Sequence, residues 1–282
     1  MSFATLKELL DPALEGHYAV GAFNVNNLEW LQAIVQAAEE ERAPLILQAS
    51  ENALAYMGLR NFAALARIAA EESTVPIAIH LDHGKSFQTA MRALREGFTS
   101  IMIDTSALPY DQNVEQTRKA VEAAGALGLA VEAELGKIGT TAEMEENPAL
   151  YTDPQEAKDF IDRTGAYALA ASVGSAHGVY KAEPRLDFDR MRRMRALLPQ
   201  TPLVLHGGSG IPDEQIRQAI AIGVAKINVN TENQVAFTRK LREVLAADAK
   251  VYDPRKVLGP GRDAIVEAVR EKMRLFGTSG KA

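Results

Sequence analysis

The sequence predicts an α/β protein built as a single (β/α)₈ TIM barrel over residues 1–282, with a short N-terminal helix and extra C-terminal helices. Short apolar runs alternate with amphipathic helical stretches eight times. The length of 282 residues is close to the roughly 250 residues usual for such barrels. No linker or shift in composition divides the chain, so we expect one domain. A doubly wound open sheet remains the alternative.

The first half of the chain opens with a helix and continues with strands and helices in turn. Thr5 is suited to cap the first helix, because Glu8 follows three residues later and Gly16 lies after its end. The helix expected over 28–42 has apolar residues at the spacing of one buried face. The expected strands are 18–23, 44–49, 76–81 and 99–103, and the expected helices are 5–15, 28–42, 61–72 and 87–96.

The second half continues the same alternation, with a long polar loop over 137–152 between its first expected strand and the helix that follows. Asp153 and Pro154 suit the N-cap and the first position of a helix. The pattern then ends in two successive helices, which close the chain. The expected strands are 130–134, 168–173, 202–206 and 225–229, and the expected helices are 112–127, 154–163, 187–198, 212–222, 231–247 and 260–275.

Composition excludes several classes of function. The chain is 47% hydrophobic and 24% charged, which is typical of a globular protein. A net charge of −6 and no run rich in Lys and Arg argue against a nucleic-acid partner. The absence of cysteine excludes disulfides, thiolate metal ligands and cysteine nucleophiles. Since neither a signal-peptide pattern nor a membrane-spanning apolar stretch is found, we expect a cytoplasmic protein with no membrane partner.

Two imidazoles and one carboxylate lie within four residues at the end of the third expected strand, in the run His80-Leu81-Asp82-His83. Side chains alternate along a strand, so His80 and Asp82 should share one face while Leu81 and His83 share the other. A lone histidine is more often structural, and we assign His80 to the core or to a supporting role.

Other polar residues also end expected strands, at the rim where barrels carry their active sites. His83, His177 and His206 fall near the ends of three different strands. Three neutral imidazoles that leave one coordination position open are typical of catalytic zinc, so we predict a metal site. The remaining rim residues are Asn24, Ser50, Asp82, Asp104, Glu134 and Asn228.

Three segments end the last three expected strands, at 173–178, 205–210 and 227–231, and the first two of them are rich in glycine. Barrels often bind phosphate after strands seven and eight, with backbone N–H groups and a helix N-terminus. Glycine allows the backbone to approach the phosphate closely. These loops could simply make turns, but three of them beside a metal site predict a phosphorylated substrate.

Five motifs resemble those of class II (zinc-dependent) fructose-1,6-bisphosphate aldolases. They are HLDHG at 80–84, VEAELG at 131–136, GSAHGVYK at 174–181, LHGGSG at 205–210 and KINVNTE at 226–232. The resemblance runs from Gly21 to Arg255 and the tail at 276–277. Tagatose-1,6-bisphosphate aldolases share most of these motifs and remain an alternative.

The resemblance implies a lyase that reversibly cleaves fructose 1,6-bisphosphate to dihydroxyacetone phosphate and glyceraldehyde 3-phosphate, in glycolysis and gluconeogenesis. Zinc would polarise the ketone and stabilise the ene-diolate. Asp82 would serve the aldehyde oxygen as an acid, and Asn228 would contact the ene-diolate. The implied metal ligands are His83, His177 and His206, with Glu134 and Asp104 at an alternative or second metal position.

The resemblance also implies the binding residues and the assembly. A monovalent cation, Na⁺ or K⁺, would lie near the phosphate. The enzyme would be a homodimer or homotetramer, in which Arg255 reaches the far phosphate from a neighbouring subunit. The implied substrate-binding residues are Asn24, Ser50, Gly178, Lys181, Gly207, Ser209, Asn230, Thr231 and Arg255.

The catalytic base is where the sequence departs from its relatives. Family members usually carry a Gly-Gly-x-Glu-Asp type stretch after the fifth strand. Here residues 139–147 read GTTAEMEEN, about one residue shorter than the commoner form. We predict Glu143 as the base, with Glu145 and Glu146 as alternatives.

Other mechanisms and functions stay open at this point. A lysine Schiff base would need Lys226, the only lysine inside an expected strand. A barrel metallohydrolase would explain the histidines but would leave Arg255 and the glycine-rich loops without a role. A non-catalytic binding protein would not need an acid, a base and an open metal position together.

Overall fold

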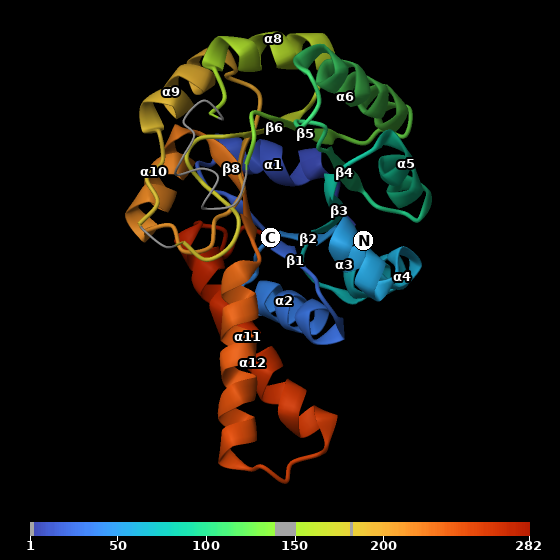
Figure 1. Cartoon of the computed structure of the whole chain (residues 1–282), viewed down its shortest axis with the longest axis vertical. Coiled ribbons are helices and arrows are strands. Elements are labelled where there is room, and N and C mark those ends of the chain that lie inside the picture. Colours follow the sequence, from blue (N-terminus) through green and yellow to red (C-terminus); the bar gives the residue numbers. More distant parts are fainter. Residues whose placement is uncertain (1–2, 139–150, 181–182) are drawn as a thin grey trace.

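The computed structural model describes residues 3–138, 151–180 and 183–282. Its strands are β1 (Val20–Asn24), β2 (Leu45–Ser50), β3 (Ile77–Gly84), β4 (Ser100–Ile103), β5 (Val131–Leu135), β6 (Ala168–Ala171), β7 (Leu203–Leu205) and β8 (Val224–Val229). All neighbouring strands pair in parallel and in sequence order, and β8 pairs with β1 to close a barrel (Figure 1). The TIM-barrel prediction is therefore confirmed. An open sheet would have two edge strands, each paired on one side only.

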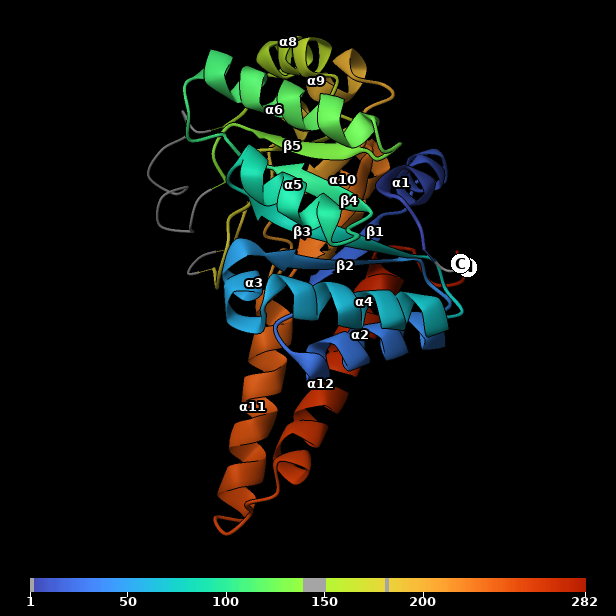
Figure 2. The same cartoon turned by 90° about the vertical axis from the view of Figure 1, so that its right-hand side faces the viewer.

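Most helices surround the barrel and pack on it through one apolar face. The described helices are α1 (Leu6–Glu15), α2 (Leu28–Glu41), α3 (Glu51–Met57), α4 (Leu59–Glu72), α5 (Phe87–Arg95), α6 (Tyr110–Gly125), α8 (Pro154–Thr164), α9 (Phe188–Leu197), α10 (Asp213–Ile222), α11 (Thr231–Ala247) and α12 (Pro254–Leu275). The exception is α1, whose Leu6 and Leu10 pack against Val20 and Met102 inside the barrel. This helix therefore closes the N-terminal end, and the C-terminal rim is left for a site (Figure 2).

Two helices differ from the sequence-based prediction. Helix α3 was not expected, and α12 begins at Pro254 rather than at Pro260. Asp253 caps α12 by accepting a hydrogen bond from the backbone N–H of Arg255, with Pro254 in the first turn. Pro260 therefore lies inside the helix, where a proline is normally unfavourable. The start of α12 repeats the Asp-Pro pattern that begins α8. This pattern indicates the start of α12 better than Pro260 does.

The last two helices form a hairpin that extends away from the barrel (Figures 1 and 2). Its base is anchored on α2, where the rings of Trp30 and Phe237 lie 4.3 Å apart. Glu41 adds ion pairs to Arg270 and Arg274 of α12. Among the described helices, none has the length and apolar character needed to cross a membrane.

Candidate active site

His83 faces the pocket because the end of β3 departs from regular strand geometry. The register between β3 and β4 shifts between Leu81 and Gly84, and His83 has a φ of 49°. A bulge and a left-handed residue re-aim a side chain that regular alternation would turn away. The expectation that His83 and Asp82 lie on opposite faces is therefore wrong: both line one pocket, 4.0 Å apart from His83 Nε2 to Asp82 Oδ1.

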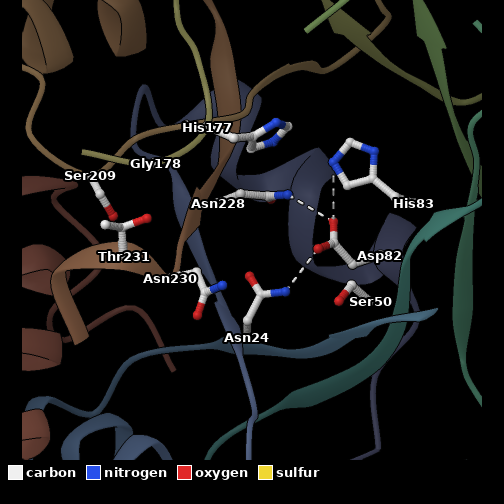
Figure 3. A pocket seen from close by; sticks show the side chains of 11 residues that line it. Asn24, Ser50, Asp82, His83, His177, Gly178, Ser209, Asn228, Asn230 and Thr231 are labelled. Carbon is white, nitrogen blue, oxygen red and sulfur yellow. Dashed lines mark hydrogen bonds and ion pairs between the residues drawn. The ribbon is translucent and has the colours of Figure 1, made fainter. Parts of the chain in front are cut away.

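The three histidines predicted as metal ligands come together at the rim. Ligand nitrogens of His83, His177 and His206 all lie within 4.8 Å of one another. The imidazole rings of His83 and His177 are 5.0 Å apart and meet edge to face, as Figure 3 shows. His83 Nε2 and His206 Nδ1 lie 2.9 Å apart. Two ligands of a tetrahedral zinc ion are about 3.3 Å apart, so the spacing suits that ion.

Carboxylates behind the rings determine which nitrogens face the centre of this group. His83 Nδ1 is 2.7 Å from Asp104 Oδ2, and His206 Nε2 is 2.8 Å from Glu132 Oε1. With those nitrogens engaged as donors, lone pairs on His83 Nε2 and His206 Nδ1 face each other and need a cation or a proton between them. Carboxylate-supported imidazoles are the usual surroundings of a bound zinc ion, so the residues present fit that metal.

Electrostatics at His83 agree with a site that attracts positive charge. Burial by itself lowers the pKa of His83, but Asp82, Asp104 and Glu134 outweigh it and raise that pKa to about 9. Burial lowers the pKa of His206 well below its usual value. A divalent cation would therefore compete with one proton on His83, and its binding should release that proton.

A second group of possible ligands lies on the other side of the His83 ring. His83, Asp104 and Glu134 have ligand atoms within 4.8 Å of one another. Burial, with the charge of Asp104, raises the pKa of Glu134 to about 7. Ser106 bridges the two carboxylates by donating to either Asp104 or Glu134, and the Lys85 ammonium pairs with Asp104. This cluster has the oxygen-rich character of a second cation position.

Asp82 is held by two amide groups at the centre of the pocket. Asn24 Nδ2 donates to one carboxylate oxygen at 2.8 Å, and Asn228 Nδ2 donates to the other at 3.1 Å (Figure 3). Gln48 in turn donates to Asn24 Oδ1 at 2.9 Å, which fixes the orientation of that amide. Burial opposes ionisation of Asp82, but the charges of His83 and His206 and the hydrogen bond from Asn24 lower its pKa. These contacts favour the carboxylate form of Asp82, which is the form that can accept a proton.

The opposite wall of the pocket is made of glycines and small polar side chains. Gly207 has a φ of 64°, and a Cβ on it would lie 2.1 Å from the carbonyl oxygen of Ala176, so only glycine fits. Thr231 opens α11, whose N-terminus carries backbone donors suited to an anion. The pocket has a volume of about 270 Å³ and is lined by Asn24, Ser50, Asp82, His83, His177, Gly178, Gly207, Ser209, Asn228, Asn230 and Thr231.

Most residues expected from the sequence thus meet at one rim, with three exceptions. Arg255 lies on α12 and does not line this pocket; its side chain is 89% exposed and pairs with Asp253. Glu143 and Lys181 lie outside the described residues. Sequence reasoning missed Gln48 and Glu132, although alternation places them on the same faces as Ser50 and Glu134.

Lys226 is not available as a Schiff-base nucleophile. It is fully buried, and its ammonium lies 2.7 Å from Glu132 Oε2. It does not line the pocket. A nucleophilic lysine must reach the substrate carbonyl, and this one is held by Glu132 outside the pocket lining.

Comparison with known proteins agrees with this geometry. The chain matches the family described as fructose-bisphosphate aldolase class-II over residues 4–281. It is 53% identical to fructose-bisphosphate aldolase of Geobacillus stearothermophilus, over 100% of this chain and 99% of that protein. A probable fructose-bisphosphate aldolase of Bacillus subtilis is 49% identical over 100% of both chains. The crystal structure of the YdjI aldolase from Escherichia coli K12 is similar with a TM-score of 0.87 and 35% identity, covering 99% of each chain. The chain therefore belongs to the class II fructose-bisphosphate aldolase family, as its motifs predicted.

Proposed function

We propose that this protein reversibly cleaves fructose 1,6-bisphosphate to dihydroxyacetone phosphate and glyceraldehyde 3-phosphate, with zinc as its metal. Membership of the class II aldolase family supports the reaction. The observation that carries it is the Asp82 carboxylate beside His83 in a pocket whose other wall is suited to phosphate. A proton acceptor, a metal position and an anion site within one cavity are the parts that this cleavage needs.

Zinc, when held by His83, His177 and His206, supplies a Lewis acid that offsets the charge developing beside the ketone. Cleavage breaks the C3–C4 bond and removes the proton of the C4 hydroxyl. Asp82 accepts that proton, and in the reverse direction it returns the proton to the new alkoxide. Asn24 and Asn228 hold both carboxylate oxygens, so the proton acceptor is oriented before the substrate arrives.

Asn228 has a second role in this proposal. Its Oδ1 is buried and has no hydrogen-bond partner within the described residues. Because Asn228 lines the pocket, this oxygen can accept a hydrogen bond from a hydroxyl group of the substrate near C3. Asn24 and Ser50 would line the aldehyde side of the same cavity.

The triose phosphate would bind on the wall formed by the loops after β6, β7 and β8. Gly178, Gly207 and Ser209 would contribute backbone or hydroxyl donors, and Asn230 and Thr231 would add the N-terminus of α11. We propose that Lys181, outside the described residues, and a monovalent cation, Na⁺ or K⁺, complete the charge balance.

We propose Asp104 and Glu134 as a second metal position rather than as ligands of the first. They share only His83 with the three-histidine group. A metal ion bound at one position would pull the His83 ring towards that position and away from the other. Binding of zinc at the two positions should therefore be coupled.

Glu143 is proposed as the base that removes the C3 proton during condensation. Glu143→Ala should keep the zinc content of the protein and lower turnover about a hundredfold or more, as expected for a lost general base. Glu145→Ala and Glu146→Ala serve as matched controls from the same loop. A normal rate for Glu143→Ala, with a large loss in either control, would move the role to that neighbour.

A homodimer or homotetramer is proposed, with Arg255 binding the far phosphate of a neighbouring subunit. Arg255 lies in the first turn of α12, at the end of a hairpin that extends away from its own barrel (Figure 2). Its guanidinium is exposed and pairs with Asp253 of the same turn, and it would exchange this partner for an anion on another copy. We further propose one domain over 1–282 and a cytoplasmic location.

The proposed function is tested by measuring triose phosphate release from fructose 1,6-bisphosphate. Activity should be lost after treatment with EDTA and should return on addition of zinc. Activity that persists through prolonged chelation would contradict the zinc mechanism. If zinc-loaded protein leaves fructose 1,6-bisphosphate intact but cleaves tagatose 1,6-bisphosphate, the substrate is the tagatose epimer. Release of inorganic phosphate without triose would instead indicate a metallohydrolase.

A further inference from the structure

A fully buried group of polar, ionisable residues lies beneath the metal-binding histidines. Glu132, Lys226 and His80 are each fully buried inside the barrel. Glu132 Oε2 is 2.7 Å from Lys226 Nζ, and the other carboxylate oxygen is 2.8 Å from His206 Nε2. His80 Nε2 lies 3.5 Å from Glu132, and His80 Nδ1 is bonded to Ser100 Oγ. None of the proposed proton transfers uses Glu132 or Lys226.

This arrangement dictates the tautomer of His206. A carboxylate paired with an ammonium accepts hydrogen bonds at both oxygens, so the short contact between Glu132 Oε1 and His206 requires the hydrogen of His206 to be on Nε2. The Nδ1 lone pair then points towards His83 Nε2, 2.9 Å away. Which nitrogen of a histidine binds a metal is set by the hydrogen bond of the other.

Lys226 fixes the orientation of the Glu132 carboxylate. Its Nζ can only donate, and it lies 2.7 Å from Glu132 Oε2. With Oε2 held there, Oε1 stays directed at His206 Nε2, 2.8 Å away. Because both side chains are fully buried, water does not compete for these contacts.

We propose that Glu132 and Lys226 form a positioning pair that holds His206 with Nδ1 towards the metal and thereby sets the zinc affinity of the site. The inference rests on the metal site of the proposed function and is independent of the sugar substrate. A merely structural ion pair makes a different prediction. Replacing such a pair by apolar residues of similar size is often neutral or stabilising for the fold, and would leave zinc affinity unchanged.

The test compares two double variants of the full chain. Glu132→Leu/Lys226→Met removes both charges and the hydrogen-bond acceptor. Its zinc affinity, measured by competition with a chelating dye, should fall about 10- to 100-fold. Glu132→Gln/Lys226→Met removes the charges but keeps a carbonyl oxygen for His206 Nε2, and should recover most of that loss.

Glu41→Gln is the matched control. Glu41 is a nearly buried carboxylate that pairs with Arg270 and Arg274, far from the histidines in sequence and on the outside of the barrel. This variant should lower the melting temperature and leave zinc affinity as it is in the wild type. A loss of zinc affinity here would show that general destabilisation, rather than His206, explains the double variants.

A second measurement decides the matter if the double variants fail to fold. Nitrogen-15 spectra of histidine-labelled, zinc-loaded wild type should show His206 protonated at Nε2. A proton on Nδ1 would overturn the inference, as would wild-type zinc affinity in the folded leucine variant or equal losses in both double variants. If the wild type itself binds no zinc, the proposed metal function fails first.

Discussion

The two walls of the pocket hold their ligands by different physical means. On the metal side, buried ionisable side chains support one another, as Asp104 supports His83 and Glu132 supports His206. On the phosphate side, glycines such as Gly207 present the backbone, and a helix N-terminus supplies donors. One wall depends on charge and the other on backbone shape. Substitutions on the metal side should therefore change the chemistry, and those on the phosphate side should change substrate affinity.

The largest effect is expected for Asp82→Asn, on the side that depends on charge. The variant keeps the shape of the side chain but cannot accept the C4 hydroxyl proton, so kcat should fall about 10²- to 10⁴-fold. Zinc content should not change, because Asp82 is not one of the three histidine ligands. Steady-state kinetics with metal analysis checks both statements. A kcat within tenfold of wild type would remove Asp82 from the proton transfer.

Gly207→Ala should break the phosphate wall without altering the metal side. The new Cβ would meet the backbone oxygen of Ala176 at 2.1 Å, and the left-handed φ adds strain of about 1–3 kcal/mol. We expect KM to rise about tenfold or more and zinc affinity to stay the same. Gly210→Ala, in the same loop but with a flexible Tyr180 ring as its nearest neighbour at 3.3 Å, is the control. Equal effects of the two variants would contradict the role assigned to Gly207.

The same contrast explains what the sequence could predict. Strand ends and glycine-rich loops are local patterns, so the barrel and most rim residues were found from them. The orientation of His83 was not, because a bulge and a left-handed backbone depend on pairing with β4 rather than on local alternation. Gln48 and Glu132 were missed for another reason. Alternation places both inside the barrel, but their roles appear only once Asn24 and His206 are brought to them from other strands.

Gln48→Leu should have a smaller effect, because Gln48 acts on Asp82 only through Asn24. Loss of its 2.9 Å hydrogen bond frees the Asn24 amide to rotate, so kcat should fall about tenfold or less with KM nearly unchanged. Gln215→Leu is a matched control, since among the described residues Gln215 forms side-chain hydrogen bonds only to the backbone of Pro184 and Leu186. The control should cost stability and leave kcat as it is. If kcat falls as much in the control as in Gln48→Leu, the loss does not come from the Asn24 amide, and Gln48 has no specific role in catalysis.

Glu41 tests the comparison from outside the pocket, where a paired carboxylate should affect stability alone. Burial opposes its ionisation, but hydrogen bonds from Arg274, Arg270 and Ser279 lower its pKa to about 2. A lowered carboxyl pKa stabilises the fold above the unfolded value of 4.5, and this contribution is lost as the pH falls through about 2. After solvent screening, the contribution is on the order of 2 kcal/mol at neutral pH.

Glu41→Gln should therefore unfold at lower denaturant than wild type at pH 7, with kcat unchanged. The difference between the two proteins should shrink as the pH falls from about 4.5 towards about 2, because the unfolded wild-type chain takes up a proton on Glu41 before the folded protein does. Denaturant titrations at several pH values check this. A pH-independent difference would mean that packing of the side chain, rather than its charge, joins α2 to α12. A loss of kcat in Glu41→Gln would show that the hairpin communicates with the pocket, and would contradict the separation between a charge-dependent site and its scaffold.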